Sequence, residues 1–285
     1  MAIRYKDAAR RIFQASCSQK KIACFGSSEP DCGSDLRAMK TRTEKVEGGW
    51  KITGSKLYIT NAPIANFITL AARTKPDLSA DAVSLFLVDL PARGLTIDNL
   101  NKEGLRGSET GLLHIDDLFV PDTHLIGEKE GTYPTIMERL SENHVGVSAS
   151  VLGLARGAYE EALQFAKTRI VRGNPIIDYQ AVANRLADMT TDIEASRWMG
   201  YWGAYKVNQG ILTDIEASKI KLVASEAALR TTKNAIRIMG CAGNLRDHNV
   251  GIHHRDGLVY VIGEATSDIQ RNIISRVLQK SETTE

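Results

Sequence analysis

EPDCGSD (residues 29–35), followed by GSKLYITN (residues 54–61), is the part of the sequence that points most directly to a fold. The first stretch packs a proline, a glycine and several acidic or hydroxyl side chains together, which is typical of a tight loop with exposed backbone N–H groups. The second begins at a turn glycine and alternates, so Tyr58 and Thr60 fall on one face of a strand. An aromatic ring beside a hydroxyl, close to such a loop, suits a flat heteroaromatic ligand with hydrogen-bonding edges.

The first half of the chain around these stretches follows the period-two pattern of β-strands. Glycine, proline and asparagine residues separate the alternating segments, as turns require. The segments expected to be strands are residues 21–25, 50–52, 56–60, 67–73, 84–89, 95–100 and 111–120. Short strands with turns between them predict an antiparallel β-barrel or sandwich.

After Pro121 the pattern changes to long segments with apolar residues at helical spacing. The expected helices are residues 133–169, 179–209, 214–239 and 263–280. Four long helices joined by short linkers predict an up-and-down bundle. The chain is therefore expected to be a multi-domain α+β protein, with a remnant N-terminal helix (1–20), a β domain (21–127) and a helical bundle (128–285).

Composition excludes several classes of protein. The chain has 285 residues with 43% hydrophobic content, which is enough for two domains with substantial cores. Lys+Arg 36 against Asp+Glu 34 leaves a net charge of +2, far from the excess that nucleic-acid binding requires. The longest apolar stretch, residues 145–155, is too short to span a bilayer.

The cysteines and the N-terminus bear on the compartment. The four cysteines have no C-x-x-C spacing, which argues against a disulfide framework or a metal site and favours a reducing compartment. We therefore expect the cytoplasm, or the mitochondrial matrix in a eukaryote. Residues 1–21 are rich in Arg and Lys and poor in acids, which fits either a solvated helix or an organelle transit peptide.

Near the C-terminus, IGEATSDIQR (residues 262–271) places Glu264 at the expected start of a helix. A carboxylate at that position is stabilised by the helix dipole and needs no further role. It can also be a general base, because a carboxylate held in a dry site close to a weak carbon acid can remove a proton from it. Both interpretations stay open at the level of this segment.

In order and spacing these segments resemble the acyl-CoA dehydrogenase family, over about residues 18–278. IGEATSDIQR is similar to the family's Glu-Gly-Thr-x-x-Ile-Gln-Arg motif. RIVRGNPI (residues 169–176) is similar to its Arg-x-x-Phe-Gly-x-Pro-Ile motif, which reaches across a subunit interface to the pyrophosphate of FAD. The family has an N-terminal helical domain, a middle β domain and a C-terminal four-helix bundle. Here most of the first is expected to be missing, apart from residues 10–21.

The resemblance implies a role for individual residues. Glu264 falls on the family's catalytic base. Residues implied to bind FAD are Phe25, Ser27, Ser28, Tyr58, Thr60, Arg169, Gln180, Arg237, Gly240, Thr266 and Asp268. Ser34 and His144 are implied to contact the substrate, His144 standing where the family usually carries an arginine.

Several positions depart from the family pattern. Ala265 replaces the usual glycine after the base, and Gly263 replaces an aromatic residue that often precedes it. Arg172, Arg237 and Cys241 replace an aromatic residue, a glutamine and a glycine. These changes are expected to reshape the acyl pocket and to weaken some FAD contacts without removing the chemistry.

The function implied by the resemblance is α,β-dehydrogenation of an acyl-CoA to a trans-2-enoyl-CoA in fatty acid metabolism. FAD is the implied cofactor, and an electron-transfer flavoprotein is the implied electron acceptor. The alternative is a non-catalytic or partial subunit of a hetero-oligomeric acyl-CoA dehydrogenase. A third interpretation is an oxidase or a monooxygenase of the same fold. Glu264 argues against a monooxygenase, because that reaction does not need a base for the α-proton.

The expected absence of the N-terminal helices bears on the oligomeric state. If the N-terminal helices are missing, the apolar surface that they cover in the family needs another cover, since soluble monomers rarely expose large apolar patches. We therefore expect an obligate homo-oligomer, a dimer of dimers formed through the bundle, or a hetero-oligomer with a partner chain.

Overall fold

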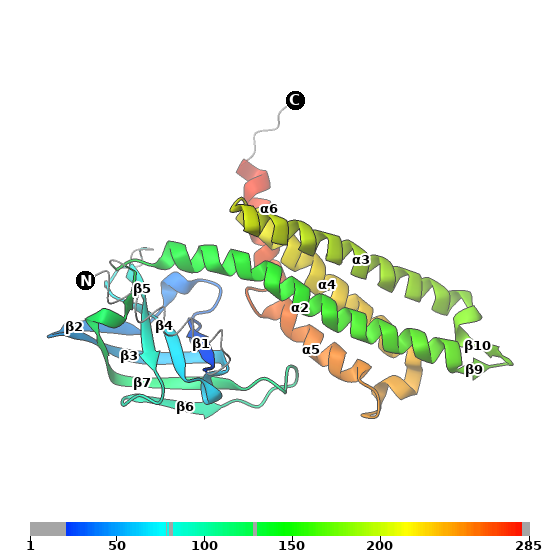
Figure 1. Cartoon of the computed structure of the whole chain (residues 1–285), viewed down its shortest axis with the longest axis horizontal. Helices are drawn as coiled ribbons and strands as arrows, with labels where there is room; N and C mark the ends of the chain where they lie inside the picture. The colour runs from blue at the N-terminus through cyan, green and yellow to red at the C-terminus, as the bar shows by residue number, and fades with distance from the viewer. Residues whose placement is uncertain (1–20, 78, 80–81, 128–129, 281–285) are drawn as a thin grey trace. The chain divides into compact units, whose positions relative to one another are not determined.

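A computed structural model of the chain describes residues 21–77, 79, 82–127 and 130–280 (Figure 1). The predicted N-terminal helix over residues 1–20 lies outside this range. The described residues form two compact units, those within 21–102 and 106–137 and those within 103–105 and 138–280. A sheet unit followed by a helical unit confirms the predicted α+β class.

The first unit is built on an eight-stranded sheet, in which the strand order is β6-β7-β3-β2-β4-β5-β8 and β1 pairs with β4. The strands are β1 (Ala23–Gly26), β2 (Arg42–Val46), β3 (Gly49–Thr60), β4 (Phe67–Arg73), β5 (Val83–Asp89), β6 (Leu95–Asn99), β7 (Thr110–Pro121) and β8 (Leu125–Ile126). Most neighbours are antiparallel, whereas β1 and β2 each pair parallel with β4. Short 3-10 helices occupy Leu36–Ala38, Ala62–Ile64 and Asp122–His124.

The core of this unit comes from the inward faces of the long strands. Ile52, Leu70, Phe86 and Leu113 are fully buried in one cluster, and the ring of Trp50 packs edge-on against Phe86. Alternation of apolar and polar residues places one side of each strand in this core. The same alternation leaves the other side free to carry a site.

The strand β3 corrects the sequence prediction. Residues 50–52 and 56–60 were expected to be separate strands with a turn at Gly54, and β2 was not predicted. The structure has one strand whose pairing with β7 is interrupted twice, between Ile52 and Gly54 and again between Lys56 and Ile59. A Cβ at Gly54 would lie 2.4 Å from Thr41 Oγ1, so this glycine permits a close approach of two segments.

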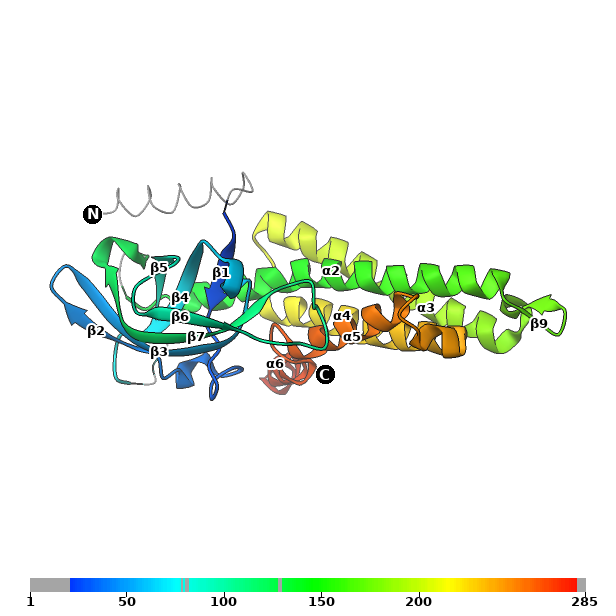
Figure 2. The same ribbon diagram turned by 90° about the horizontal axis from the view of Figure 1, so that it is seen from below.

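The second unit is helical (Figure 2). Its helices are α2 (Tyr133–Thr168), α3 (Gln180–Gln209), α4 (Asp214–Met239), α5 (Val250–Ile262) and α6 (Ser267–Lys280). A small hairpin of β9 (Ile170–Val171) and β10 (Asn174–Pro175) follows α2, with 3-10 turns at Ile176–Asp178 and Gly240–Asn244. In the part of the chain that the structure describes, no helix is long and apolar enough to span a membrane.

Two predictions for the helical unit were wrong. The helix α5 was not predicted, because Gly251 and Gly257 interrupt its sequence and no side chain caps its start. The last helix was expected to start at Gly263 but starts at Ser267. The residues between them form a turn, since Glu264 and Ala265 have positive φ angles of 54° and 64°.

Substitution at Gly54 tests the close approach of β3 to Thr41. Gly54→Ala would force a Cβ to within 2.7 Å of the Thr41 Cα atom, so the backbone of one segment has to shift. We expect a loss of about 2 kcal/mol or more in the free energy of unfolding, measured with urea. Gly107→Ala is the matched control, because a Cβ there meets no atom within 4 Å. Equal stability of the two variants would contradict the tight crossing.

Candidate functional site

A turn between α5 and α6 carries the glutamate singled out by the sequence. Glu264 and Ala265 both adopt left-handed backbone conformations without being glycine. Such residues cost on the order of 1 kcal/mol each and persist when their surroundings hold them. The Glu264 side chain is exposed in the isolated chain, and no described residue hydrogen-bonds to its carboxylate.

Three buried side chains from three helices hold the carbonyl groups of this turn. His144 of α2 donates from Nε2 to the Glu264 carbonyl oxygen at 3.1 Å. Lys221 of α4 donates from Nζ to the Ala265 carbonyl oxygen at 2.8 Å. Gln270 of α6 donates from Nε2 to both carbonyls, at 3.4 Å each. Each carbonyl of the turn therefore accepts two hydrogen bonds.

The protonation of these groups follows from their burial. Burial lowers the pKa of His144, although its hydrogen bond to Glu264 works in the opposite direction. A carbonyl can only accept, so the neutral imidazole carries its proton on Nε2 and leaves Nδ1 without a described partner. Burial also lowers the pKa of Lys221 to about 8, despite the nearby charges of Glu264 and Glu226.

Two further predicted residues lie at the same turn. Thr266 caps α6, because its Oγ1 accepts a hydrogen bond of 3.2 Å from the Ile269 N–H. Asp268 is exposed in the first turn of α6 and forms a surface ion pair with Arg271. The structure therefore brings Glu264, Thr266 and Asp268 together, with the predicted substrate residue His144 buried beneath them.

The remaining predicted residues of the helical unit lie at its other end. Arg169 and Gln180 flank the β9–β10 hairpin, and Arg237 and Gly240 end α4; all of them are exposed. Ala166, Ile176 and Met239 of these segments pack in one core cluster, which keeps this end together. Thr168 lies 24 residues beyond His144 on one helix, or roughly 36 Å at about 1.5 Å per residue. One chain thus carries two separate groups of candidate residues.

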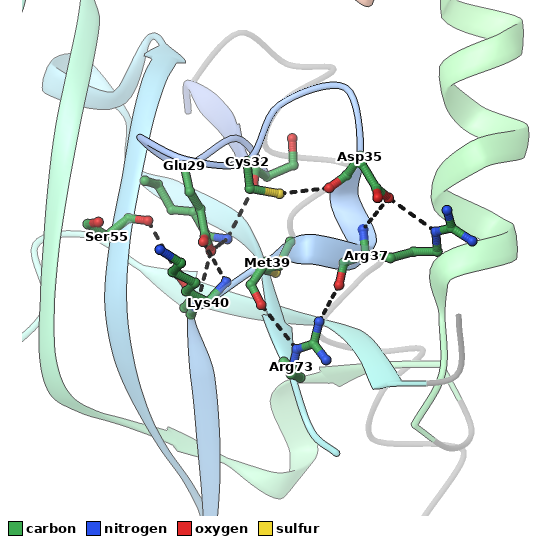
Figure 3. A network of polar contacts seen from close by, with 11 residues as sticks. Glu29, Cys32, Asp35, Arg37, Met39, Lys40, Ser55 and Arg73 are labelled. Atoms are coloured by element: carbon green, nitrogen blue, oxygen red, sulfur yellow. Dashed lines mark hydrogen bonds and ion pairs between the residues drawn. The ribbon is translucent and has the colours of Figure 1, made fainter. Parts of the chain in front are cut away.

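In the sheet unit, a buried ion pair anchors the EPDCGSD loop. The Glu29 carboxylate accepts hydrogen bonds from Lys56 Nζ at 2.8 Å, from the Lys40 N–H at 2.6 Å and from the Thr41 N–H at 2.9 Å (Figure 3). Lys56 Nζ also donates to the Ser27 carbonyl at 3.2 Å. Burial by itself would raise the pKa of Glu29, but the charge of Lys56 and these hydrogen bonds lower it, so the carboxylate stays ionised.

A second buried cation holds the segment that follows this loop. The guanidinium of Arg73 on β4 donates to the carbonyl oxygens of Met39, at 3.0 Å, and of Arg37 (Figure 3). It also donates to the Asp77 carbonyl oxygen. Lysine and arginine are rarely buried unless paired. Here Lys56 and Arg73 both donate to backbone carbonyl oxygens, and they thereby fix the backbone conformation of the loop region.

This framework fixes an exposed set of aromatic and hydroxyl groups. The Leu57 N–H donates to the Ser28 carbonyl at 2.9 Å, which brings the loop after β1 beside β3. Phe25, Tyr58 and Thr60 are exposed there, and Tyr58 is 70% exposed at the pairing break in β3. No described residue bonds to the hydroxyls of Ser27, Ser28, Ser34 or Thr60. Free hydroxyls beside aromatic rings suit the flat heteroaromatic ligand expected from the sequence.

The buried polar residues that support both segments were not predicted from the sequence. Lys221 had a visible signal, because it shares the helical spacing of the buried residues Ala217, Ala224 and Ala228. Lys56 had a weaker one, a lysine within an apolar strand. Gln270 lay inside the quoted C-terminal motif but was not assigned a role.

Comparisons with known proteins agree on one family. A model described as the middle domain of acyl-CoA dehydrogenase matches residues 24–118, and one described as the C-terminal domain matches residues 131–279. The acyl-CoA dehydrogenase of Bacillus subtilis is 36% identical over 258 residues, which cover 90% of this chain and 68% of that protein.

Two further proteins are similar to this chain. The mitochondrial short-chain specific acyl-CoA dehydrogenase of Bos taurus is 35% identical, over 93% of this chain and 64% of that protein. The solved structure of butyryl-CoA dehydrogenase from Megasphaera elsdenii matches with a TM-score of 0.90 at 30% identity, over 93% of this chain and 70% of that one. The chain spans about two thirds of the length of these relatives.

Removing the buried cation of the sheet unit should destabilise that unit. Lys56→Met leaves the Glu29 carboxylate buried with two backbone donors, and we expect a loss of about 3 to 5 kcal/mol in urea unfolding. Lys40→Met removes only an exposed ion pair to Asp31 and should change stability little. Adding Glu29→Gln to Lys56→Met should recover part of the loss. A Lys56→Met variant as stable as Lys40→Met would show that the pair does not anchor the loop.

Lys221 should make stability depend on pH. Its pKa is about 8 in the folded chain against 10.5 ordinarily, so between these values the unfolded state binds more protons and stability rises with pH. Each unit of pKa difference corresponds to about 1.4 kcal/mol, so burial of the charged lysine lowers the free energy of unfolding by roughly 3 kcal/mol. This loss is fully present below pH 8 and disappears above pH 10.5. The unfolding free energy of the wild type minus that of Lys221→Met should therefore increase from about pH 8 to pH 10. A constant difference would mean that Lys221 is not buried as a cation.

Proposed function

The chain belongs to the acyl-CoA dehydrogenase family, and from this premise we propose that it oxidises the Cα–Cβ bond of an acyl-CoA thioester to a trans-2-enoyl-CoA. Members of the family are FAD-dependent oxidoreductases that act on a CH–CH group. The single observation that supports the proposal most is Glu264, whose carboxylate has no described partner while its backbone is held by buried donors.

In this proposal Glu264 takes the proton from Cα. A carboxylate without a competing partner can approach the substrate carbon, and exclusion of water by the acyl chain strengthens its basicity. Hydrogen bonds to the thioester oxygen have to stabilise the enolate as it forms. When FAD is bound, it supplies the acceptor for the hydride that leaves Cβ.

We assign FAD binding to residues that fit its chemistry in each unit separately. In the sheet unit, Tyr58 and Thr60 of β3 and Ser27 and Ser28 after β1 offer an aromatic surface and free hydroxyls to a ring with polar edges. In the helical unit, Arg169 is an exposed guanidinium without a described partner, which suits a pyrophosphate. Gln180 begins α3 beside it.

The separation of the two groups in the helical unit supports an oligomer. Arg169 directly follows α2, and that end of the helix lies roughly 36 Å from His144, which contacts the Glu264 turn. Arg169 and Glu264 of one chain are therefore too far apart to act side by side at one site. We therefore assign Arg169 to the cofactor of a neighbouring chain, in a dimer of dimers. An electron-transfer flavoprotein is the proposed electron acceptor, and a second type of chain in the assembly is the alternative.

The substrate class is proposed from the relatives. Two of them are described as short-chain specific and as butyryl-CoA dehydrogenase, which favours a short acyl chain. The alternative function, a non-catalytic subunit, is favoured by the substitutions at Ala265, Arg172, Arg237 and Cys241. Retention of Glu264 and Arg169 favours the enzyme.

The base is tested by Glu264→Gln, which keeps size and hydrogen bonding but removes basicity. We expect FAD to remain bound while the rate of flavin reduction by butyryl-CoA falls about 10²- to 10⁴-fold. Glu142→Gln is the control, since that carboxylate pairs with Arg139 on the surface of α2. Full activity in Glu264→Gln, with a loss in Glu142→Gln, would move the base to Glu142.

The proposed sharing between chains is tested by complementation. Arg169→Ala should release FAD and weaken assembly, whereas Lys167→Ala, an exposed residue in the last turn of α2, should do neither. Arg169→Ala and Glu264→Gln chains, inactive alone, should regain activity when co-assembled, because each supplies what the other lacks. If mixed assemblies bind FAD but have no activity, Arg169 and Glu264 of one chain act on the same FAD, and the proposed sharing between chains is wrong.

A further inference from the structure

The hydrogen bonds beneath the Glu264–Ala265 turn have no role in completing the helices. At the end of α5, Gly263 follows the last helical residue and donates its N–H to the Val259 carbonyl. The start of α6 is capped by Thr266. The carbonyls of Glu264 and Ala265 lie between the two helices, and the buried donors reach them specifically.

Burying these donors is unfavourable for folding on its own. Lys221 and Gln270 are fully buried and His144 is 6% exposed. His144 Nδ1 and Gln270 Oε1 have no hydrogen-bond partner among the described residues. Apolar residues of similar volume would pack there without such unsatisfied groups. The arrangement is therefore better explained by what it holds than by the stability it contributes.

The turn itself needs external support. Both of its residues have left-handed backbone, and neither is a glycine, so its conformation is not favoured locally. The direction of the Glu264 side chain depends on that backbone. A carbonyl fixed by two donors cannot rotate away without leaving buried donors unpaired.

We propose that Lys221, His144 and Gln270 are positioning residues, which hold the Glu264–Ala265 carbonyls and thereby fix the direction of the base. They act through the backbone of the turn and take no proton in the reaction. The proposal rests on the proposed function of Glu264, but the hydrogen bonds can be tested without it.

The first test observes the Ala265 carbonyl directly and needs no flavin. Ala-Thr occurs once in the sequence, at residues 265–266, so labelling with ¹³C-carbonyl alanine and ¹⁵N-threonine gives a single carbonyl–amide NMR correlation. A carbonyl carbon is deshielded when its oxygen accepts a hydrogen bond. Lys221→Met, which keeps the length of the side chain, should move this resonance upfield. Lys219→Met, an exposed lysine two residues away, should leave it in place.

The second test measures flavin reduction by butyryl-CoA in the holoenzyme. A misplaced base should lower kcat about 10- to 100-fold with little change in KM. His144→Gln retains a donor near the position of Nε2 and should keep most of the rate, whereas His144→Leu should lose it. Rescue by the glutamine separates positioning from general loss of packing, because both replacements fill the site.

The outcomes distinguish this inference from the proposed function. A resonance that does not move in folded Lys221→Met, or a full rate in His144→Leu, overturns the positioning role. If Lys221→Met does not fold, the rates of flavin reduction in the two His144 variants decide. A wild type that binds FAD but shows no reduction by any acyl-CoA overturns the proposed function, and the NMR result still judges the hydrogen bonds.

Discussion

The structure depends on a turn whose backbone its own residues do not favour. Glu264 and Ala265 lie in left-handed conformations between α5 and α6, and buried donors from α2, α4 and α6 hold their carbonyls. Three helices must therefore pack in one register for the glutamate to be presented in one direction. The alanine-rich faces of α2 and α4 make this register tight, because small side chains allow close helix packing. The chemistry proposed for Glu264 would in this sense depend on the whole helical unit.

The sheet unit uses the same device at its own candidate site. Lys56 is buried with Glu29 and donates to the Ser27 carbonyl, much as Lys221 donates to the Ala265 carbonyl. In each unit a buried lysine thus fixes the backbone beside a residue that is proposed to contact a ligand: Ser28 in the sheet unit and Glu264 in the helical unit. Buried charges of this kind cost stability and provide a defined geometry. The two units thus solve a similar problem with unrelated folds.

Helices and strands were predicted correctly where the sequence has a clear local periodicity. The helix α4 and the strand β4 were predicted with their observed limits, because each has uninterrupted periodicity and clear ends. The course of β3 was missed, since its pairing breaks at Gly54 and Tyr58 arise from contacts with Thr41 and β7 that are distant in sequence. The role of Glu264 as a base was predicted by resemblance and stays a prediction. Lys221 and Lys56 were not singled out, because lysine is ordinarily a surface residue. What holds the site depends on tertiary burial, which a single sequence does not reveal.

In the proposed function, this turn presents a base for dehydrogenation of an acyl-CoA thioester. An anaerobic titration of the flavin-containing protein with butyryl-CoA tests it most directly. We expect the visible absorption of oxidised flavin to be lost, with one trans-2-enoyl-CoA formed for each flavin reduced. Flavin that stays oxidised in the presence of bound butyryl-CoA and of longer and branched acyl-CoA thioesters would contradict it.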